Sequence, residues 1–401
     1  MFRYLLLIFC VSFPVFAQNT VVLLSIDGFS NRYLQDYLPQ NILKMAKEGV
    51  RAEALLPVFP TKTFPNHISM VTGVYPAKHG IIHNKFYDPL RQKTYYVGAG
   101  KHDASWLKAE PIWTIAEKQG IKSATYFWPE SEAKISGVRP SYYFPYDKAA
   151  SNQTRIDQIL NWLKLPSEER PYFLAAYFST VDDAGHSFGT ESTELRDAIE
   201  QLDQNIGELN RRIATEIEYG VDIILVSDHG MTAAGAKNTI AWAGLFNSEG
   251  IKVINGQTQL FLYFSDKARI NDTRSQLMSG QNENSPQYQV FQKGNFPPKW
   301  HFDSELAVIP DIIVNAFPPF TFTDSQSYGG KATHGYDARH DKNLDAIFIA
   351  KGPSFQRNKV IPPFENINIF ALLQELLELE PQAITDSKLG PLLPALKKGN
   401  S

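Results

Sequence analysis

The sequence predicts an α/β fold with a mostly parallel central sheet, helices on both faces of that sheet, and an inserted α+β lobe. Three observations support this fold class. Short continuous apolar runs, typical of buried strands, alternate with longer stretches of helical periodicity. Several of the apolar runs end directly in Asp, His or Gly, as expected at the carboxyl edge of a parallel sheet. Residues from about 236 to 330 break the alternation.

The strands and helices of the central unit can be placed in chain order. The predicted strands are Thr20–Ile26, Ile121–Phe127, Tyr172–Ser179, Val221–Val226 and Ala346–Ala350, and the predicted helices are Asn41–Glu48, Ile156–Leu163 and Glu194–Glu216. Strands that alternate with helices form parallel sheets covered on both faces. We therefore expect one large domain over residues 18–401.

The inserted lobe is predicted over residues 236–330, beside the functional site. Val253–Gly256 precedes the alternating apolar run Leu260–Phe264, which is typical of strands. The stretch from Asn282 to Pro298 is polar and rich in turn-forming residues. The sequence does not indicate what this lobe does.

The first 17 residues have the pattern of a signal peptide. Arg3 precedes an apolar core from Leu5 to Phe16, and Ala17 is the small residue expected before a cleavage site. The alternative is a retained N-terminal anchor, although the run is shorter than the ~20 apolar residues of a membrane span. We expect export to a bacterial periplasm or exterior, with no membrane span in the mature chain.

Cysteine and charge exclude several classes of protein. The only cysteine is Cys10, inside the predicted signal peptide, so the mature chain has no disulfide, Cys metal ligand or Cys nucleophile. The absence of a cysteine from the predicted mature chain also argues against sulfatases, which convert a cysteine into their catalytic residue. The net charge of −3 argues against duplex nucleic acid as a partner. A small-molecule substrate is expected instead, and the oligomeric state stays open.

Candidate metal ligands occur in separate short motifs. Each one alone has an ordinary interpretation, such as a turn, a surface loop or a helix cap. Together they supply three carboxylates and three imidazoles, namely Asp27, Asp182, Asp228, His186, His229 and His334. That set suits two zinc ions with three protein ligands each and open positions left over. The imidazoles favour zinc, but another divalent ion is an alternative.

Thr63 is the candidate nucleophile. It lies in the segment Pro60–His67, where a threonine at the start of a helix is ordinarily an N-cap. Placed between two metal ions, the same hydroxyl would lose its proton and attack phosphorus. A threonine without such help has little nucleophilic power at neutral pH.

The order of these motifs resembles the nucleotide pyrophosphatase/phosphodiesterase family (type I phosphodiesterases) of the alkaline phosphatase superfamily. The resemblance begins at Phe59–His67 and extends through nearly the whole mature chain, and the other matching motifs are Val71–Gly73, Tyr75–Pro76, His79–Ile81, Phe127–Pro129, Asp182–His186, Ser227–Met231, His334–Asp337, Ala346–Phe348, Gly352–Pro353 and Ile361–Asn366.

The resemblance implies a role for each site residue. Thr63 would form a phospho-threonine intermediate that water hydrolyses, and Asn84, helped by the Phe64 backbone N–H, would donate to a phosphoryl oxygen. One zinc would be held by Asp182, His186 and His334, and the other by Asp27, Asp228 and His229, with Thr63 also bound to metal.

The chain departs from the family pattern in two places. His83 stands where the family usually has an acidic residue before the asparagine, and Val181 stands where it usually has proline. Both departures leave the ligand positions intact. They put the rim of the site and the choice of substrate in doubt.

Two features favour diesters or pyrophosphate-type bonds of nucleotides. No arginine stands in the motifs, although monoester hydrolases of the superfamily commonly use one against the extra phosphate charge. By family position, Phe64 and Tyr146 would form a slot for a base, with Trp128 and Glu132 lining the same pocket; the alternative is that these aromatic rings belong to the core. The expected product is a nucleoside 5′-monophosphate.

Two other functions remain open on the sequence alone. One is a choline-phosphodiester or lysophospholipid phosphodiesterase with the same metal chemistry. The other is a catalytically inactive secreted binding protein that keeps the fold. A missing ligand would mark the latter, and the sequence lacks none of the six.

Overall fold

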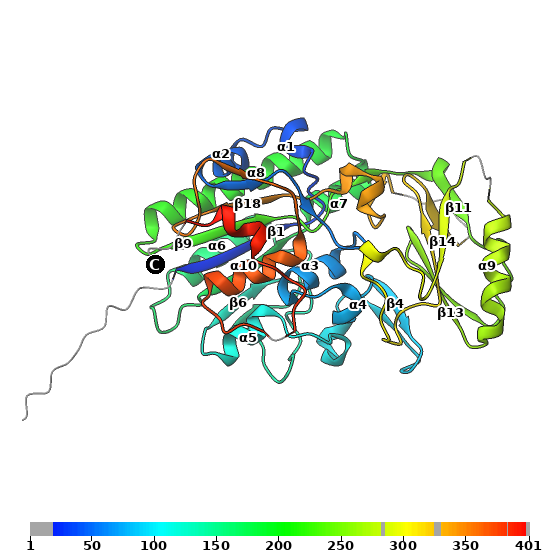
Figure 1. Cartoon of the computed structure of the whole chain (residues 1–401). Helices are drawn as coiled ribbons and strands as arrows, with labels where there is room; N and C mark the ends of the chain where they lie inside the picture. The colour runs from blue at the N-terminus through cyan, green and yellow to red at the C-terminus, as the bar shows by residue number, and fades with distance from the viewer. Residues whose placement is uncertain (1–18, 282–284, 325–329, 383, 398–401) are drawn as a thin grey trace, which may run out of the picture.

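A computed structural model describes residues 19–281, 285–324, 330–382 and 384–397 of the chain (Figure 1). The predicted signal peptide, residues 1–17, and Cys10 within it lie outside the described residues.

An eight-stranded sheet forms the centre of the molecule, which confirms the predicted α/β class. Five neighbouring strands are parallel, in the order β7-β6-β8-β1-β9, and β18 pairs antiparallel with β9. The sheet is completed by β2 and β19 beyond β18. In this order the strands are β19 (Lys359–Ile361), β2 (Val50–Ala52), β18 (Phe348–Lys351), β9 (Val221–Val226), β1 (Thr20–Ile26), β8 (Phe173–Phe178), β6 (Ser123–Tyr126) and β7 (Tyr142–Phe144).

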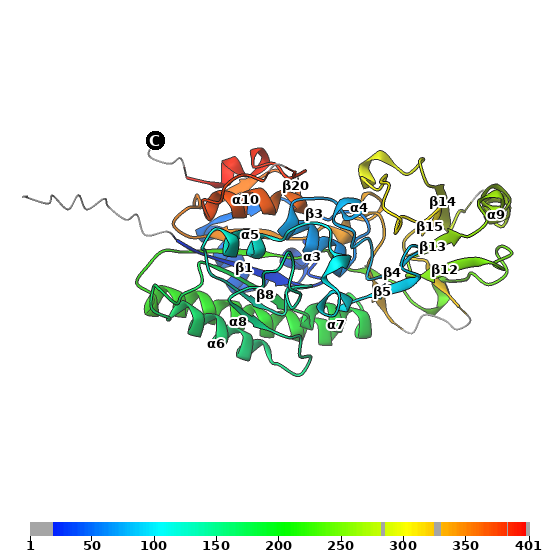
Figure 2. The ribbon, with the colours of Figure 1, turned by 90° about the horizontal axis from the view of Figure 1, so that it is seen from below.

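Helices cover both faces of this sheet (Figures 1 and 2). One layer contains α2 (Gln40–Glu48), α6 (Asn152–Leu163), α7 (Thr180–Phe188) and α8 (Thr193–Glu216), and the opposite layer contains α3 (Thr63–Thr72), α5 (Ile112–Lys118) and α10 (Ile369–Leu376). The central strand β1 is buried over its whole length. Val21 and Leu23 point into one core while Val22, Leu24 and Ile26 point into the other, because successive side chains of a strand face opposite sides.

A smaller antiparallel sheet lies beside the main one, within the predicted lobe (Figure 1). Its strand order is β12-β13-β15-β14, with α9 (Ile270–Ser279) at the outer end of the molecule. The strands are β12 (Ile251–Asn255), β13 (Gln259–Phe264), β14 (Tyr288–Gln292) and β15 (Ile312–Ala316). The lobe has a hydrophobic core of its own, which includes Leu260, Leu262 and Leu277.

Shorter elements complete the structure. They are α1 (Tyr33–Asp36), β3 (Leu55–Leu56), α4 (Pro76–His79), the hairpin β4 (Lys85–Asp88) and β5 (Lys93–Tyr96), β10 (Thr232–Ala233), β11 (Thr239–Ala241), β16 (Thr321–Thr323), β17 (Ala332–Thr333) and β20 (Phe364–Glu365). Hairpin β4–β5 reaches the lobe, where the Tyr87 N–H donates to the Tyr263 hydroxyl at 3.4 Å.

Several predicted boundaries differ from the structure by one to four residues, and two of these differences have a clear local reason. The helix predicted to begin at Ile156 begins at Asn152, because the Ser151 side chain accepts the Thr154 N–H and caps its first turn. The strand predicted from Ala346 begins at Phe348, because Ala346 forms an isolated bridge with Leu55.

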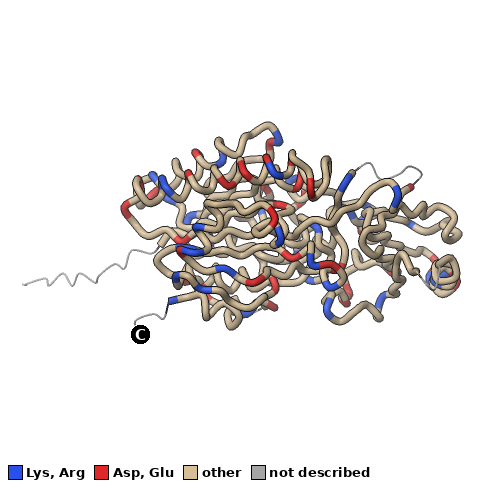
Figure 3. The backbone as a smooth tube through the Cα atoms, turned by 90° about the horizontal axis from the view of Figure 1, so that it is seen from above, with Lys and Arg blue, Asp and Glu red and all other residues tan. Residues whose placement is uncertain are grey.

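Lysines and arginines are interspersed with acidic residues over the described part of the molecule (Figure 3). Within the described ranges, no helix is both long and apolar enough to cross a bilayer.

A side chain of α8 caps the first turn of α2, and this contact gives a test of how the two helices pack together. Pro39 precedes α2 and supplies no side-chain cap, but the buried Asp203 carboxylate of α8 accepts the N–H groups of Asn41 (3.0 Å) and Ile42 (2.8 Å). We predict that Asp203→Ala lowers the free energy of unfolding by about 2 kcal/mol, because two N–H donors lose a charged acceptor. Urea denaturation measures it.

The matched control is Asp197→Ala, which removes an exposed aspartate from the same helix and is expected to change stability by less than ~0.5 kcal/mol. Equal losses in the two variants would show that the Asp203 contact contributes nothing specific.

Candidate metal centre and active site

Three aspartates converge at the carboxyl edge of the three central strands. Asp27 directly follows β1, Asp228 lies two residues after β9, and Asp182 lies in the first turn of α7, just after β8. Because β8, β1 and β9 are neighbours and run parallel, their carboxyl ends lie side by side. Asp182 belongs to a helix that starts directly after the strand, which places His186 one turn further on the same face.

Gly28 makes this convergence possible. Its backbone has φ +70°, which favours glycine, and a Cβ at this position would lie 2.9 Å from the Asp182 Cβ and Oδ1. A side chain here would push Asp182 away from Asp27. The Asp-Gly pair, which alone resembles an ordinary turn, is thus required by the approach of β1 to α7.

Side-chain atoms of the aspartates and histidines form two compact groups. The ligand atoms of Asp27, Asp228 and His229 lie within 4.8 Å of one another, and so do those of Asp182, His229 and His334. His186 lies next to the second group, with its Nε2 at 3.5 Å from Asp182 Oδ2. All six predicted ligands are therefore brought together, with His229 positioned between the two groups.

Each aspartate has a buried oxygen that the protein leaves without a hydrogen bond. These atoms are Asp27 Oδ1, Asp182 Oδ1 and Asp228 Oδ2, and the fourth unpartnered atom of the cluster is His229 Nε2. The other oxygens of two aspartates are held in place: Tyr177 donates its hydroxyl to Asp27 Oδ2 at 2.5 Å, and the Gly28 N–H donates to Asp228 Oδ1 at 3.2 Å. Buried polar atoms are rarely left unpaired in proteins.

The three histidines are oriented in the same way. The Nδ1 atoms of His186, His229 and His334 lie 2.9, 2.9 and 2.7 Å from the backbone carbonyls of Ala332, Gly230 and Thr61. A carbonyl only accepts, so Nδ1 carries the proton and Nε2 is the basic atom of each neutral ring. Each Nε2 in turn lies 3.0–3.7 Å from an aspartate of the cluster. Histidine ligands of metals are commonly fixed by such carbonyl contacts.

Electrostatics also favour a bound cation. Burial, followed by repulsion from Asp228 and Asp182, raises the pKa of Asp27 well above its usual value. Burial and repulsion from Asp182 raise the pKa of Asp228 in the same way. Burial lowers the pKa of His229 and His334, so both rings are neutral. Neutral imidazoles beside mutually repelling carboxylates fit a pair of divalent ions, which would remove the repulsion.

Thr63 is the first residue of α3, on the wall of a cavity that is also lined by two of the metal-ligand candidates, Asp27 and Asp182. The N-cap of α3 is Lys62, and its side chain makes no capping bond. The ordinary interpretation of Thr63 as an N-cap is therefore wrong. The strand-like backbone of Lys62 and the start of α3 instead present Thr63 to the cavity.

Asn84 contacts the residue after Thr63. Its Oδ1 accepts the Phe64 N–H at 3.0 Å. The resemblance assigned this N–H to a phosphoryl oxygen, but here it holds Asn84. The Asn84 side chain thereby lies at the same edge as Thr63, with its amide NH₂ as the remaining donor.

A cavity of about 330 Å³ extends from these residues. It is lined by Asp27, Asp182, Thr63, Asn84 and Tyr177 at one end, and further on by Phe64, Trp128, Glu132, Tyr146, Lys101 and Glu130 among others. The four predicted base-pocket residues Phe64, Trp128, Glu132 and Tyr146 thus share one space with the candidate nucleophile. Glu132 accepts the Tyr146 N–H at 2.9 Å, which anchors the half-exposed Tyr146.

Three further residues hold this site, the buried His67 and Lys62 and the half-buried Tyr177, and no role for them was predicted from the sequence. His67 lies one turn after Thr63: its Nδ1 donates to the Thr63 carbonyl at 2.9 Å and its Nε2 accepts from the Ser25 hydroxyl at 2.8 Å. Lys62 donates to the His334 carbonyl at 2.8 Å, and Tyr177 anchors Asp27. His67 and Lys62 lie inside the sequence motif around Thr63, and their place in that motif is the one feature of the sequence that could have indicated a role for them.

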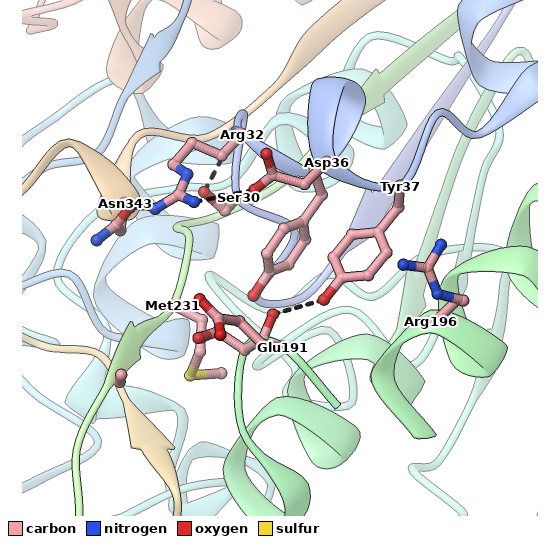
Figure 4. Close-up of a pocket in the computed structure, with 11 residues that line it drawn as sticks. Ser30, Arg32, Asp36, Tyr37, Glu191, Arg196, Met231 and Asn343 are labelled. Carbon is pink, nitrogen blue, oxygen red and sulfur yellow. Dashed lines mark hydrogen bonds and ion pairs between the residues drawn. The ribbon is translucent and has the colours of Figure 1, made fainter. Parts of the chain in front are cut away.

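Another cavity, of about 490 Å³, lies away from these groups, between α1, the start of α8 and β10 (Figure 4). Its arginines are already engaged. Arg32 bonds Asn343 and pairs with Asp36, and Arg196 lies over the Tyr37 ring. None of the six metal-ligand candidates lines it. We therefore place the functional site at the carboxyl edge of β8, β1 and β9.

Known proteins resemble this chain over most of its length. An uncharacterized pyrophosphatase/phosphodiesterase of Schizosaccharomyces pombe is 34% identical over 96% of this chain and 82% of its own. Ectonucleotide pyrophosphatase/phosphodiesterase family member 1 of Homo sapiens is 33% identical over 91% of this chain, and family member 3 of Bos taurus is 33% identical over 90%. The chain spans only 40% and 42% of the length of these two relatives.

A solved structure shows the same fold. The murine ectonucleotide pyrophosphatase/phosphodiesterase 5, as an inactive threonine-to-alanine variant in complex with AMP, superposes with a TM-score of 0.86 at 25% identity. The match covers 95% of this chain and 100% of the other. The family described as type I phosphodiesterase/nucleotide pyrophosphatase matches residues 21–337, which include every candidate ligand. The chain therefore belongs to the type I phosphodiesterase/nucleotide pyrophosphatase family, whose members are phosphodiester and pyrophosphate hydrolases.

Proposed function

We propose that this protein hydrolyses phosphodiester and pyrophosphate bonds of nucleotides with two bound zinc ions, through a phospho-threonine at Thr63, and releases a nucleoside 5′-monophosphate. One observation carries the proposal. A single cavity is lined by Asp27 and Asp182, each of which has an unpartnered oxygen, and by Thr63, Asn84 and a group of aromatic residues.

The ligand set supports two ions, which together would have three imidazole ligands. Asp27, Asp228 and His229 would hold one ion, and Asp182, His186 and His334 the other. Zinc is favoured because imidazole nitrogens and carboxylate oxygens are its common ligands in catalytic sites. When bound, the ions would lower the pKa of the Thr63 hydroxyl and neutralise charge on the phosphoryl group.

The reaction proceeds in two displacements. The Thr63 oxygen attacks phosphorus and forms a P–O bond, while the bond to the leaving group breaks and that group takes the electron pair. Water then attacks the phospho-threonine and loses a proton, the bond to Thr63 breaks, the Thr63 oxygen takes the electron pair and a proton, and the nucleoside monophosphate is released. Asn84 donates its amide N–H to a non-bridging oxygen as negative charge develops there.

The shape of the site supports a nucleotide as the group transferred to Thr63. Phe64 and Tyr146 offer aromatic faces to a base, and Lys101 with Glu132 offers a donor and an acceptor to its edge. No arginine is found among the described residues that line this cavity, which agrees with a diester. The AMP complex of the murine relative provides independent support for this choice of ligand.

A second cleft, of about 420 Å³, suits the leaving group. Asn84 lines both clefts, and Lys62, Lys85 and His186 are among the other residues of the second. Two lysines favour an anionic leaving group such as a phosphate. Burial lowers the pKa of Lys62 to about 8, so it still carries most of its charge at pH 7.

A choline phosphodiester is the alternative substrate. A trimethylammonium group is held by aromatic faces and anionic groups. Glu130 and Glu132 of the cavity would attract such a cation and Lys101 would repel it, so the nucleotide assignment rests on the aromatic pair and on the AMP complex of the murine relative. An inactive binding protein is disfavoured because all six ligand candidates and Thr63 stand at one site. Export rests on the sequence of residues 1–17 and is part of the proposal.

Metal binding is expected to stabilise the fold. We predict that zinc raises the melting temperature of metal-free protein and that two ions per chain are found by elemental analysis. Asp228→Asn removes a repelling charge, so this variant without metal is expected to melt above metal-free wild type and to respond weakly to zinc. Asp183→Asn, an exposed neighbour of Asp182, is the matched control and should behave as wild type.

Thr63→Ala is predicted to lower kcat by at least ~10³-fold, because the attacking oxygen is removed. Thr63→Ser keeps a hydroxyl and should retain measurable turnover. Hydrolysis of a thymidine 5′-monophosphate p-nitrophenyl ester measures both. Unchanged turnover by Thr63→Ala would refute the phospho-threonine mechanism.

Substrate choice can be tested at Tyr146. We predict that Tyr146→Ala raises KM for the thymidine ester about tenfold, the loss of one base-stacking contact, and leaves bis(p-nitrophenyl) phosphate unaffected. The matched control is Tyr143→Ala, a similarly exposed tyrosine that does not line the cavity. Faster turnover of p-nitrophenyl phosphocholine than of the thymidine ester would overturn the nucleotide assignment.

A further inference from the structure

The His83 side chain closes a short hydrogen-bonded turn around Asn84. Its Nδ1 accepts the Lys85 N–H at 3.1 Å, so the ring bridges from the residue before Asn84 to the residue after it. Such a side-chain bond to the backbone two residues on fixes the dihedral angles of the residue between. Burial, followed by the nearby Lys62, lowers the pKa of His83 well below its usual value, so the ring is a neutral acceptor.

The other edge of the His83 ring contacts the small lobe. A Cβ added to Gly256 would lie 2.5 Å from His83 Cε1 and 2.6 Å from Nε2, so the bare backbone of Gly256 lies against the ring. Phe261 of β13 meets it edge to face, with ring centroids 5.3 Å apart. The ring is only 3% exposed. The ring is therefore held between the Lys85 N–H on one side and the lobe on the other.

Asn84 is therefore held from two directions. Phe64, on the side of Thr63, donates its N–H to the Asn84 side chain. His83, on the side of the lobe, fixes the Asn84 backbone. The orientation of the Asn84 amide NH₂ depends on both contacts, since one fixes the side chain and the other the main chain from which it extends.

We propose that His83 is a positioning residue that ties Asn84 to the small lobe, through Gly256 and Phe261, and so aims its amide at the reacting phosphoryl group. This inference rests on the proposed function, in which Asn84 stabilises the transition state. It gives the lobe a task in the reaction: its β12–β13 turn supports the ring that orients Asn84.

A double-mutant cycle with Asn84 tests the proposal on the full-length, zinc-loaded protein. We expect His83→Leu, which fills the space but accepts no hydrogen bond, to lower kcat for the thymidine ester by about 10- to 100-fold with little change in KM, as a displaced catalytic group does. Asn84→Ala should lower kcat by about 100-fold. In the Asn84→Ala background, His83→Leu should have no further effect.

Two further variants separate the local bond from simple packing. His83→Asn keeps an acceptor for the Lys85 N–H and should retain kcat within about fivefold of wild type. Gly256→Ala places a methyl group against the ring, and it should lower kcat in wild type but not in a His83→Ala background, where the space is open. Zinc content and melting temperature are measured for every variant.

Each outcome decides a different point. Additive losses in the Asn84 cycle, or a loss from Gly256→Ala that persists with His83→Ala, would overturn the positioning role. If His83→Leu fails to fold, the comparison of Gly256→Ala in wild type with Gly256→Ala in the His83→Ala background tests the positioning role alone. Absence of turnover by wild type would refute the proposed function, whereas normal wild-type turnover with independent effects would refute only the role of His83.

Discussion

Repulsion among Asp27, Asp182 and Asp228 is the constraint on which the site depends. Three neighbouring parallel strands deliver these carboxylates to one edge of the sheet, and the burial of Asp27 and Asp228 removes water that would screen them. The protein anchors one oxygen of Asp27 and one of Asp228 and leaves their other oxygens unpartnered. A pair of bound cations is the simplest way to compensate the repulsion among these carboxylates. The residues around the cluster are arranged in a way that fits such a pair.

The surrounding residues fix orientation more than they add charge. Three backbone carbonyls set the tautomers of His186, His229 and His334, so that each presents Nε2 to the carboxylates. His67 holds the first turn of α3 against β1, and with it Thr63. Since these contacts come from loops and helix starts on a rigid sheet, the geometry is built before any substrate arrives.

The small lobe fixes side-chain orientation on the opposite side of the site. Its β12–β13 turn lies against His83, and the hairpin that follows Asn84 contacts β13 through Tyr87 and Tyr263. The cavity lined by Phe64 and Tyr146 is formed entirely by the main unit, whereas the cleft beyond Asn84 includes Asn255, Gly256 and Gln257 of the lobe. The two units therefore meet at Asn84, between the two clefts.

Residue types and their order in the sequence were enough to predict the α/β class, the alternation of strands and helices, and the six ligand candidates, because apolar runs and chemically distinctive side chains are local properties. Tertiary structure alone decided that Thr63 is not the helix cap and that Asp182 starts a helix. It also decided that the Phe64 N–H holds Asn84 and that His83 lies against Gly256, 173 residues away in the chain. These contacts join segments far apart in sequence, and their partners carry no distinctive pattern: a backbone N–H or a glycine becomes informative only when packing brings it within bonding or steric distance.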